Sequence, residues 1–336
     1  MRSGEPSAAD ASTDKVATGR RETLYSVVIP VYGNEGSLPQ LSERLSALTA
    51  ELDAGLEVVF VVDGSPDRSA DVLAELLPGQ PFASRLVLHS RNFGSFAAIR
   101  TGLQRTTGRY VGVMAADLQE PPELMVEFFA RLRTGESDIV LGRRRSRAGD
   151  PQLSAAGARA FWALYRRLVQ PEMPVGGVDV FACTDEFRAH LVELDESHSS
   201  LVSLTLWLGF RRATVEYDRL PREHGESGWT LRKKLAYLSD SIFSFTDLPI
   251  RLLLGVGVLG LLASLAISLV VLAARLTGAI DVPGYAATIL VLAFFGALNL
   301  FGLGIIGAYV WRAFENTKRR PQSVVMVDRE IPAARR

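Results

Sequence analysis

Most of the chain alternates short apolar runs with stretches whose apolar residues recur at helical spacing. Unbroken apolar strands separated by amphipathic helices are typical of a mostly parallel sheet covered by helices on both faces. The pattern therefore predicts an α/β fold. The runs and the helices expected after them are YSVVIP with 36–53, EVVFVVD with 67–77, RLVLH with 95–105, YVGVM with 122–133 and DIVLG with 154–169.

Two longer apolar runs follow near the end of the chain. Residues 252–274 contain no charge, and residues 284–311 form a second uncharged run. Each is longer than the ~20 residues that a helix needs to cross about 30 Å of hydrocarbon. Buried core helices are the alternative, but core helices of soluble proteins seldom run this long without charge. We therefore expect two transmembrane helices within residues 251–312.

Basic residues flank the two expected spans, whereas the loop between them, RLTGAIDVP, has one arginine and one aspartate. The positive-inside rule then places both ends in the cytoplasm and a short loop outside. This predicts a multi-pass protein of the inner (plasma) membrane whose catalytic domain is cytoplasmic. The flanking residues are Arg232, Lys233, Lys234, Arg251, Arg312, Lys318, Arg319 and Arg320.

Composition divides the remaining chain into segments. Residues 1–23 are polar and lack an apolar stretch, so we expect a disordered segment with no secretory signal. A globular domain should cover 24–225, and residues 313–336 should form a cytoplasmic tail. Residues 226–250 combine apolar residues at helical spacing with a basic cluster, which suits an interfacial amphipathic helix; a helix packed on the domain is the alternative. With 37 basic and 37 acidic residues, the chain gives no reason to expect nucleic acid as a partner.

Polar residues follow four of the expected strands. Because ligands of open α/β sheets bind beyond the carboxyl ends of the strands, these residues predict one shared site for a small polar ligand. Any single member has an ordinary alternative, such as a turn at Asp63-Gly64-Ser65. The four segments are PVYGNE (30–35), VDGS (62–65), SRNFGS (90–95) and ADLQEPPE (116–123).

Asp117 and Gln119 are the candidates for a site that holds a metal ion and a diphosphate. Mg²⁺ and Mn²⁺ prefer oxygen ligands, and such an ion compensates the charge of a departing diphosphate. In an extended segment, side chains two positions apart point to the same side. Asp63 is placed to accept hydrogen bonds from a base or ribose. Two acids near strand ends are a weak signal on their own.

The order of these segments resembles the membrane-anchored polyprenyl-phosphate glycosyltransferases of inverting glycosyltransferase family 2. That group includes dolichol-phosphate mannose synthases, bactoprenol glucosyltransferases and the undecaprenyl-phosphate aminoarabinose transferase. The resemblance covers residues 25–325, and DLQ-x-PPE combined with two C-terminal spans is its most specific part. It also rests on VVIPVYGNEGSL, VVDGSPDRS, SRNFGSFAAIRTGL, DIVLGRRRSR, SFTDLPIRL and RAFENTKRRP.

The resemblance implies a GT-A (Rossmann-like) domain that moves a single sugar from a UDP-, GDP- or dTDP-linked donor to polyprenyl (undecaprenyl) phosphate on the cytoplasmic leaflet. The lipid-linked sugar would serve cell-envelope glycan or glycolipid assembly. Its implied residues are Pro30, Tyr32, Glu35, Asp63, Asp117 and Gln119 for the nucleotide sugar, Asp117 and Gln119 for Mg²⁺ or Mn²⁺, Arg144, Arg147 and Arg222 for the acceptor phosphate, and Asp117, Arg144 and Arg222 for catalysis.

The acceptor needs placement rather than a catalytic base. A phosphate monoester has a second pKa near 6, so its oxygen is largely ionised at neutral pH. Arginines can then orient it and compensate its charge. For the arginines of the RRRSR segment, a solvated loop attracted to anionic lipid is the alternative.

The chain departs from the family pattern at three positions. Ala115 replaces the first acid of DADLQ, Val62 replaces a frequent aspartate, and Gly228 replaces a common lysine. These changes favour either a different donor or a catalytically weakened lipid-binding scaffold, and the retained acids and arginines favour an enzyme. A processive polysaccharide synthase is a further alternative, although more spans and a QxxRW motif would be expected. A homo-oligomer is compatible with the sequence.

Overall fold

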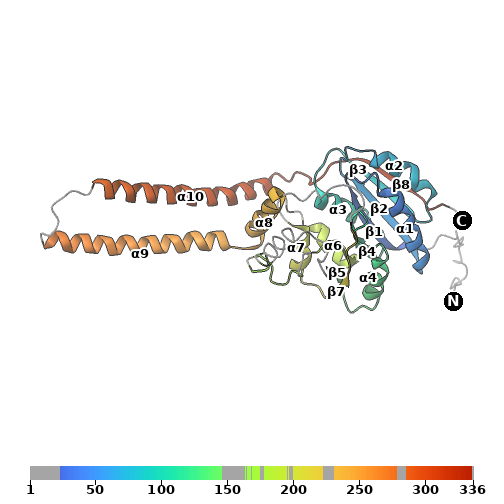
Figure 1. The fold of residues 1–336 in the computed structure, drawn as a ribbon, viewed down its shortest axis with the longest axis horizontal. Coiled ribbons are helices and arrows are strands. Elements are labelled where there is room, and N and C mark those ends of the chain that lie inside the picture. Colours follow the sequence, from blue (N-terminus) through green and yellow to red (C-terminus); the bar gives the residue numbers. More distant parts are fainter. Residues whose placement is uncertain are drawn as a thin grey trace, which may run out of the picture.

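The computed structural model describes residues 23–145, 163, 165–167, 169–174, 178–194, 196, 200–221, 231–277 and 285–334. A globular α/β part is joined to two long helices that extend away from it side by side (Figure 1). Except for Thr23, the segment 1–23 that was expected to be disordered lies outside the described residues, as does most of the helix expected at 154–169.

An eight-stranded sheet in the order β7-β5-β6-β4-β1-β2-β3-β8 forms the centre of the globular part. The sheet is mostly parallel, as predicted: β6 and β8 run antiparallel to their neighbours, and the remaining strands share one direction. The strands are β1 Thr23–Val31, β2 Gly55–Val62, β3 Ala83–His89, β4 Tyr110–Val113, β5 Ile139–Arg144, β6 Phe181–Thr184, β7 Arg212–Tyr217 and β8 Val325–Ile331.

The central strands are apolar on both faces because helices cover both sides of the sheet. Along β1, Val27 and Ile29 join one core cluster while Val28, between them, joins the other. Hydrophobic burial on both faces is what an unbroken apolar run provides. The first cluster is covered by α1 Leu38–Glu51, α2 Ser69–Leu76 and α4 Leu124–Arg133, and the second by α3 Ser95–Leu103, α6 Asp185–Glu193 and α7 Leu201–Trp207.

Three further helices connect the globular part to the end of the chain: α8 Leu231–Phe245, α9 Leu248–Leu276 and α10 Tyr285–Thr317. α8 lies within the range expected for an amphipathic helix, and Tyr237 and Ile242 pack it against the second core cluster. Arg312 of α10 donates to Asp240 of α8 at 2.7 Å, which fastens the base of the long helices to the domain.

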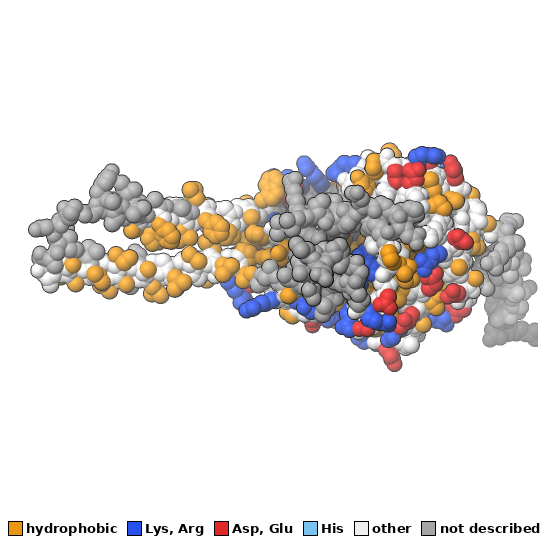
Figure 2. All heavy atoms as spheres, viewed as in Figure 1, with side chains coloured by type: hydrophobic (Ala, Val, Ile, Leu, Met, Phe, Trp, Pro, Cys, Tyr) orange, Lys and Arg blue, Asp and Glu red, His pale blue; other side chains and the backbone are white. Residues whose placement is uncertain are grey.

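The long helices α9 and α10 present large hydrophobic side chains outward along their length (Figure 2). By length and composition, Phe294–Thr317 is one described helix that could cross a membrane. The pair Tyr237–Phe245 and Leu248–Gly260, bent by 74°, would count as a second. Where α9 and α10 approach each other, a Cβ added to Gly302 would lie 3.1 Å from Leu253, so the absence of a side chain permits this close packing.

The C-terminal segment is not a simple tail, in contrast to our expectation for residues 313–336. α10 continues to Thr317, and the chain then returns to the sheet as β8, antiparallel to β3. Asp328 of β8 accepts hydrogen bonds from Arg85 at 2.6 Å and from Arg105 at 2.8 Å. Both ends of the two-helix segment are therefore attached to the same globular part.

Candidate functional site

The loops after β1 and β2 are tied together at the carboxyl edge of the sheet. The amide of Gly33 donates to Ser65 at 2.8 Å, and the amide of Glu35 donates to the Asp67 carboxylate at 3.0 Å. The Glu35 carboxylate in turn accepts from the amide of Arg68 at 2.9 Å. Burial opposes ionisation of Asp67, but hydrogen bonds from Ser65, Ser69 and the Glu35 amide lower its pKa to about 2. Charged and polar groups thus fix the shape of this edge.

Pro30 and Tyr32 lie at the end of β1, beside these loops. Pro30 is partly buried within the strand, and the Tyr32 ring is 52% exposed. The Tyr32 amide donates to Asn34 at 3.0 Å, which holds the backbone while the ring stays accessible. An exposed aromatic ring at a strand end can stack on a flat ligand such as a nucleobase.

Asp63 is buried and organises the loop that follows β3. Its carboxylate accepts from the amides of Phe93 at 2.9 Å and Gly94 at 2.7 Å, and it lies 2.7 Å from Nδ1 of His89. The side chain therefore holds the backbone of the loop after β3 in place at the edge of the site. Its predicted contact with base or ribose is untested and stays a prediction.

Gly64 is needed where the loop after β2 meets the loop after β3. Its φ is +58°, in the left-handed region that favours glycine. A Cβ at this position would lie 2.3 Å from the carbonyl carbon of Arg91. The DGS segment is therefore more than an ordinary turn, because only glycine allows the two loops this close approach.

The segment after β4 is a turn, which corrects the extended conformation assumed for Asp117 and Gln119. Leu118, between them, has a φ of +59°, a conformation that is uncommon and strained for a residue with a branched side chain. The Asp117 carboxylate accepts from the Gln119 amide at 3.3 Å. The Gln119 carbonyl accepts from the amide of Leu220 at 2.9 Å, which links this turn to the chain after β7.

Glu120 is a residue that the sequence did not single out. It is 1% exposed, and neither of its carboxylate oxygens has a hydrogen-bond partner within the described structure. The nearest described cation is Arg219, whose Nε lies 3.4 Å from Oε1. Burial, followed by the charges of Asp179 and Asp117, raises the pKa of Glu120 to about 7, although Arg219 and Arg144 oppose the shift.

Arg144, expected to meet the acceptor phosphate, is the last residue of β5 and its side chain is 12% exposed. It forms an ion pair with Asp179, which precedes β6, although its Nε has no hydrogen-bond partner within the described structure. The Asp117 turn, Glu120, Asp179 and Arg144 thus form one charged cluster at the carboxyl ends of β4 and β5. Arg147 and Arg222, the other predicted phosphate ligands, lie outside the described residues.

The residues present fit a divalent cation that takes part of its coordination from a ligand. Among the described residues, no group of three or more His, Cys, Asp and Glu side chains is arranged to hold a metal ion. Asp117 and Gln119 supply oxygen atoms of the kind that Mg²⁺ and Mn²⁺ prefer. The buried Glu120 carboxylate beside them, with no hydrogen-bond partner, adds negative potential that a cation would offset. Ala115 adds no ligand.

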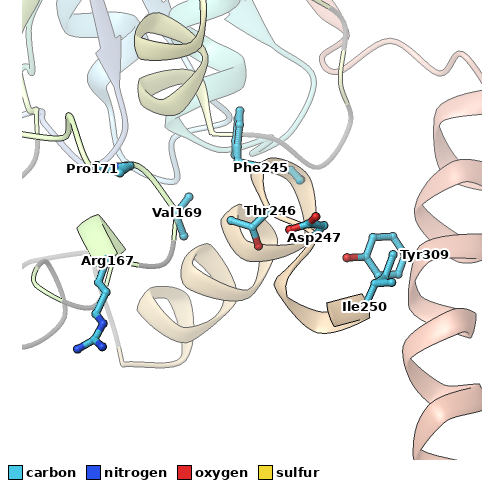
Figure 3. Close-up of a pocket in the computed structure, with 9 residues that line it drawn as sticks. Arg167, Val169, Pro171, Phe245, Thr246, Asp247, Ile250 and Tyr309 are labelled. Carbon is cyan, nitrogen blue, oxygen red and sulfur yellow. The ribbon is translucent and has the colours of Figure 1, made fainter. Parts of the chain in front are cut away.

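A separate cavity of about 540 Å³ lies at the base of the long helices, between the α8–α9 bend and α10 (Figure 3). Arg167, Phe245 and Ile250 contribute to its lining, and the Tyr309 hydroxyl points toward Asp247. Of the residues predicted from the sequence for nucleotide, metal or phosphate, those that the structure describes do not line this cavity.

Comparison with known proteins gives consistent matches. The family model described as glycosyl transferase family 2 matches residues 26–193. An uncharacterized glycosyltransferase of Synechocystis sp. is 33% identical over 89% of this chain and 94% of its own length. The undecaprenyl-phosphate 4-deoxy-4-formamido-L-arabinose transferase of Pseudomonas aeruginosa is 33% identical over 93% of this chain and 92% of its own length. A solved structure, glucosyl-3-phosphoglycerate synthase from Mycobacterium tuberculosis, is 20% identical with a TM-score of 0.47 and covers 66% of this chain and 77% of that one.

Proposed function

Because the chain belongs to glycosyltransferase family 2 and has the GT-A fold, we propose that it moves a single sugar from a nucleotide-sugar donor to polyprenyl phosphate at a membrane surface. The enzyme class follows from the family, whereas the donor, the acceptor and the membrane placement are the content of the proposal. The name of the Pseudomonas aeruginosa relative, an undecaprenyl-phosphate sugar transferase, supports a lipid phosphate as the acceptor.

The observation that carries the proposal is the distance between the strand-end site and the base of the apolar helices. α10 ends at Thr317, and Ser323 already contacts Thr101 of α3, next to the end of β3. The six Cα–Cα steps from Thr317 to Ser323, with five residues between them, span at most about 20 Å even when fully extended. An enzyme whose acceptor is a lipid headgroup requires this proximity, and a soluble acceptor does not.

The paired helices α9 and α10 support a membrane hairpin with both ends on one side. β8 returns to the sheet after α10, so the chain leaves the globular part and comes back to it. Lysine and arginine side chains lie where the helices join the globular part (Figure 2). In the proposal this face meets the cytoplasmic leaflet, where basic residues are favoured, and the loop between the helices lies outside.

In the proposed reaction, the donor nucleotide lies over the β1 and β2 loops and the diphosphate near Asp117 and Gln119. The exposed ring of Tyr32 can stack on the base, and Pro30, Glu35 and Asp63 shape the edge beneath it. A divalent cation held by Asp117 and Gln119 would compensate the charge of the departing nucleotide diphosphate. UDP, GDP and dTDP donors all meet these requirements.

The acceptor is already ionised, so the chain's task is to place it. The lipid phosphate attacks the anomeric carbon, the bond to the diphosphate breaks, and the sugar is transferred with inversion. Arg144 belongs to the charged cluster and ends β5, and we propose Arg147 and Arg222 as its partners in binding the phosphate. The cavity at the base of the helices, with Arg167 in its lining, supports an approach for the lipid from the membrane side.

Purified full-length protein in detergent, incubated with radiolabelled UDP-, GDP- and dTDP-sugars, Mg²⁺ or Mn²⁺ and undecaprenyl phosphate, tests the proposal. We expect label to enter the lipid extract with at least one donor. Asp117→Ala should abolish that label, whereas Asp71→Ala, an exposed acid in the first turn of α2, should not affect it. Label in a polymer would indicate a processive synthase, and absence of turnover with every donor would indicate a scaffold; either result would refute the proposal.

A further inference from the structure

A continuous chain of hydrogen bonds runs from Asp63 to the segment after α10. Nδ1 of His89 lies 2.7 Å from the Asp63 carboxylate, and Nε2 of His89 lies 2.9 Å from the hydroxyl of Thr101. The Thr101 hydroxyl lies 2.7 Å from that of Ser323. Asp63, His89 and Thr101 are each at most 3% exposed. This hydrogen-bond chain therefore crosses the protein interior and ends at the C-terminal segment.

Donors and acceptors alternate in one consistent direction along this hydrogen-bond chain when His89 is neutral. Asp63 can only accept when it is ionised, so Nδ1 of His89 donates to it and Nε2 becomes an acceptor. The Thr101 hydroxyl then donates to Nε2, which leaves its oxygen to accept from Ser323. Each hydroxyl fixes the orientation of the next group, and hydrogen bonds aligned in this way strengthen one another in a buried setting.

The carboxylate, imidazole and hydroxyl resemble a nucleophilic triad only in composition. Thr101 is 1% exposed, so its oxygen has no access to a substrate. The hydrogen-bond chain instead affects the amides of Phe93 and Gly94, because they donate to Asp63 at its inner end. Through these amides it influences the conformation of the loop at the strand-end site.

The backbone of the C-terminal segment is fixed at the same place. The amide of Ser90 donates to the carbonyl of Val324 at 2.9 Å, and Val325 of β8 pairs with His89. The register between β3 and β8 shifts between Leu88 and His89. The segment after α10 is thus docked at His89, the residue that orients Asp63.

We propose that Ser323, Thr101 and His89 are positioning residues that couple the docked C-terminal segment to nucleotide binding. They hold Asp63 in the orientation in which it binds the amides of the 90–94 loop. When the segment after α10 is docked on the domain, this loop therefore has the conformation that binds the donor nucleotide. The inference rests on the proposed function, in which this edge of the sheet holds the donor nucleotide.

Single substitutions along the chain test the inference in the full-length protein. Thr101→Val removes both links through the hydroxyl at nearly constant volume, and Thr101→Ser retains them. Ser323→Ala removes only the last link. Gln322→Ala is the matched control. Gln322 is adjacent to Ser323 but is not part of the hydrogen-bond chain, because its side chain donates to the carbonyl of Glu196 at 2.9 Å. Nucleotide affinity is measured by titration calorimetry with UDP, GDP and dTDP, and donor KM, acceptor KM and kcat are measured by turnover.

We expect Thr101→Val to weaken nucleotide binding about tenfold and Ser323→Ala about threefold, the scale of coupling between groups in one buried network. Donor KM should rise in parallel, while acceptor KM and kcat at saturating donor stay unchanged. Thr101→Ser should restore most of the affinity, and Gln322→Ala should bind like the unmodified protein.

Three results would overturn the inference. If the unmodified protein binds nucleotide and transfers sugar but Thr101→Val and Ser323→Ala bind as tightly, the proposed function stands and the coupling is wrong. The same holds if acceptor KM and kcat change as much as donor KM, because a general loss of structure produces that pattern. If the unmodified protein binds none of the three nucleotides, the proposed function and the coupling are both wrong.

Discussion

Glu120 provides the sharpest test of the charged cluster at the ends of β4 and β5. Its side chain is buried without hydrogen bonds within the described structure, close to the charges of Asp117 and Asp179. Glu120→Gln keeps the size of the side chain and removes its ability to ionise. The variant therefore isolates the free-energy cost of holding this carboxylate in the folded protein.

The magnitude follows from the pKa, which the folded protein raises from 4.5 to about 7. Because the folded-state pKa is the higher one, the folded protein retains a proton that the unfolded chain has already lost between these values. The contribution of Glu120 to the free energy of unfolding thus falls as pH rises from about 4.5 to 7 and changes no further above that range. At ~1.4 kcal/mol per pKa unit, the loss is on the order of 3 kcal/mol, and Glu120→Gln avoids it.

Thermal unfolding in detergent with EDTA, followed from pH 4.5 to 8, measures this difference. We expect the two proteins to unfold alike near pH 4.5, and Glu120→Gln to unfold several degrees higher at pH 8, since ~1 kcal/mol shifts Tm by about 2–4 °C in a domain of this size. Glu127→Gln is the control: Glu127 is half exposed and paired with Arg131, so its loss should change stability by less than ~0.5 kcal/mol. A difference between Glu120→Gln and the unmodified protein that is independent of pH would refute the assignment of a costly buried carboxylate.

Three further predictions concern other parts of the structure. Gly64→Ala should weaken nucleotide binding and lower Tm by more than Gly33→Ala, because both have positive φ but only a Cβ at position 64 meets backbone; equal effects measured by calorimetry and thermal unfolding would contradict the close approach. The Cys183 thiol should resist labelling in the native protein and react after unfolding, because burial raises its pKa to about 12; rapid labelling of native protein by a thiol reagent would contradict this. Ala115→Asp should lower the Mg²⁺ or Mn²⁺ concentration needed for half-maximal turnover, and an unchanged metal titration would show that position 115 is remote from the ion.

The central sheet could be predicted because hydrophobic burial on both faces leaves a continuous apolar run in the sequence. β1 to β5 and the helices α1 to α4 lie where these runs and their following amphipathic segments predict them. β8 was missed because its residues Met326 to Glu330 are exposed, so burial imposed little apolar pattern on the strand. Backbone pairing with β3, rather than hydrophobicity, determines its place, and pairing partners cannot be identified from one sequence.

The sequence predicted where the polar segments lie in the fold, but not the conformation or burial of their individual residues. The polar segments after β1, β2 and β4 do meet the carboxyl edge of the sheet, as parallel strands require. The positive φ of Leu118 and the burial of Glu120 depend on tertiary packing, which the local sequence does not encode. Asp179 lies outside any motif, and its ion pair with Arg144 arises only because β6 inserts between β4 and β5.

Mass spectrometry of the lipid product tests the account most directly. Full-length protein is incubated with undecaprenyl phosphate and the nucleotide sugar that it uses, and the extracted lipid is analysed before and after the reaction. We predict that the mass of the lipid increases by one sugar residue and does so only when the phosphate headgroup is present. An unchanged lipid, a series of masses that indicates repeated addition, or equal transfer to a lipid without the phosphate would contradict it.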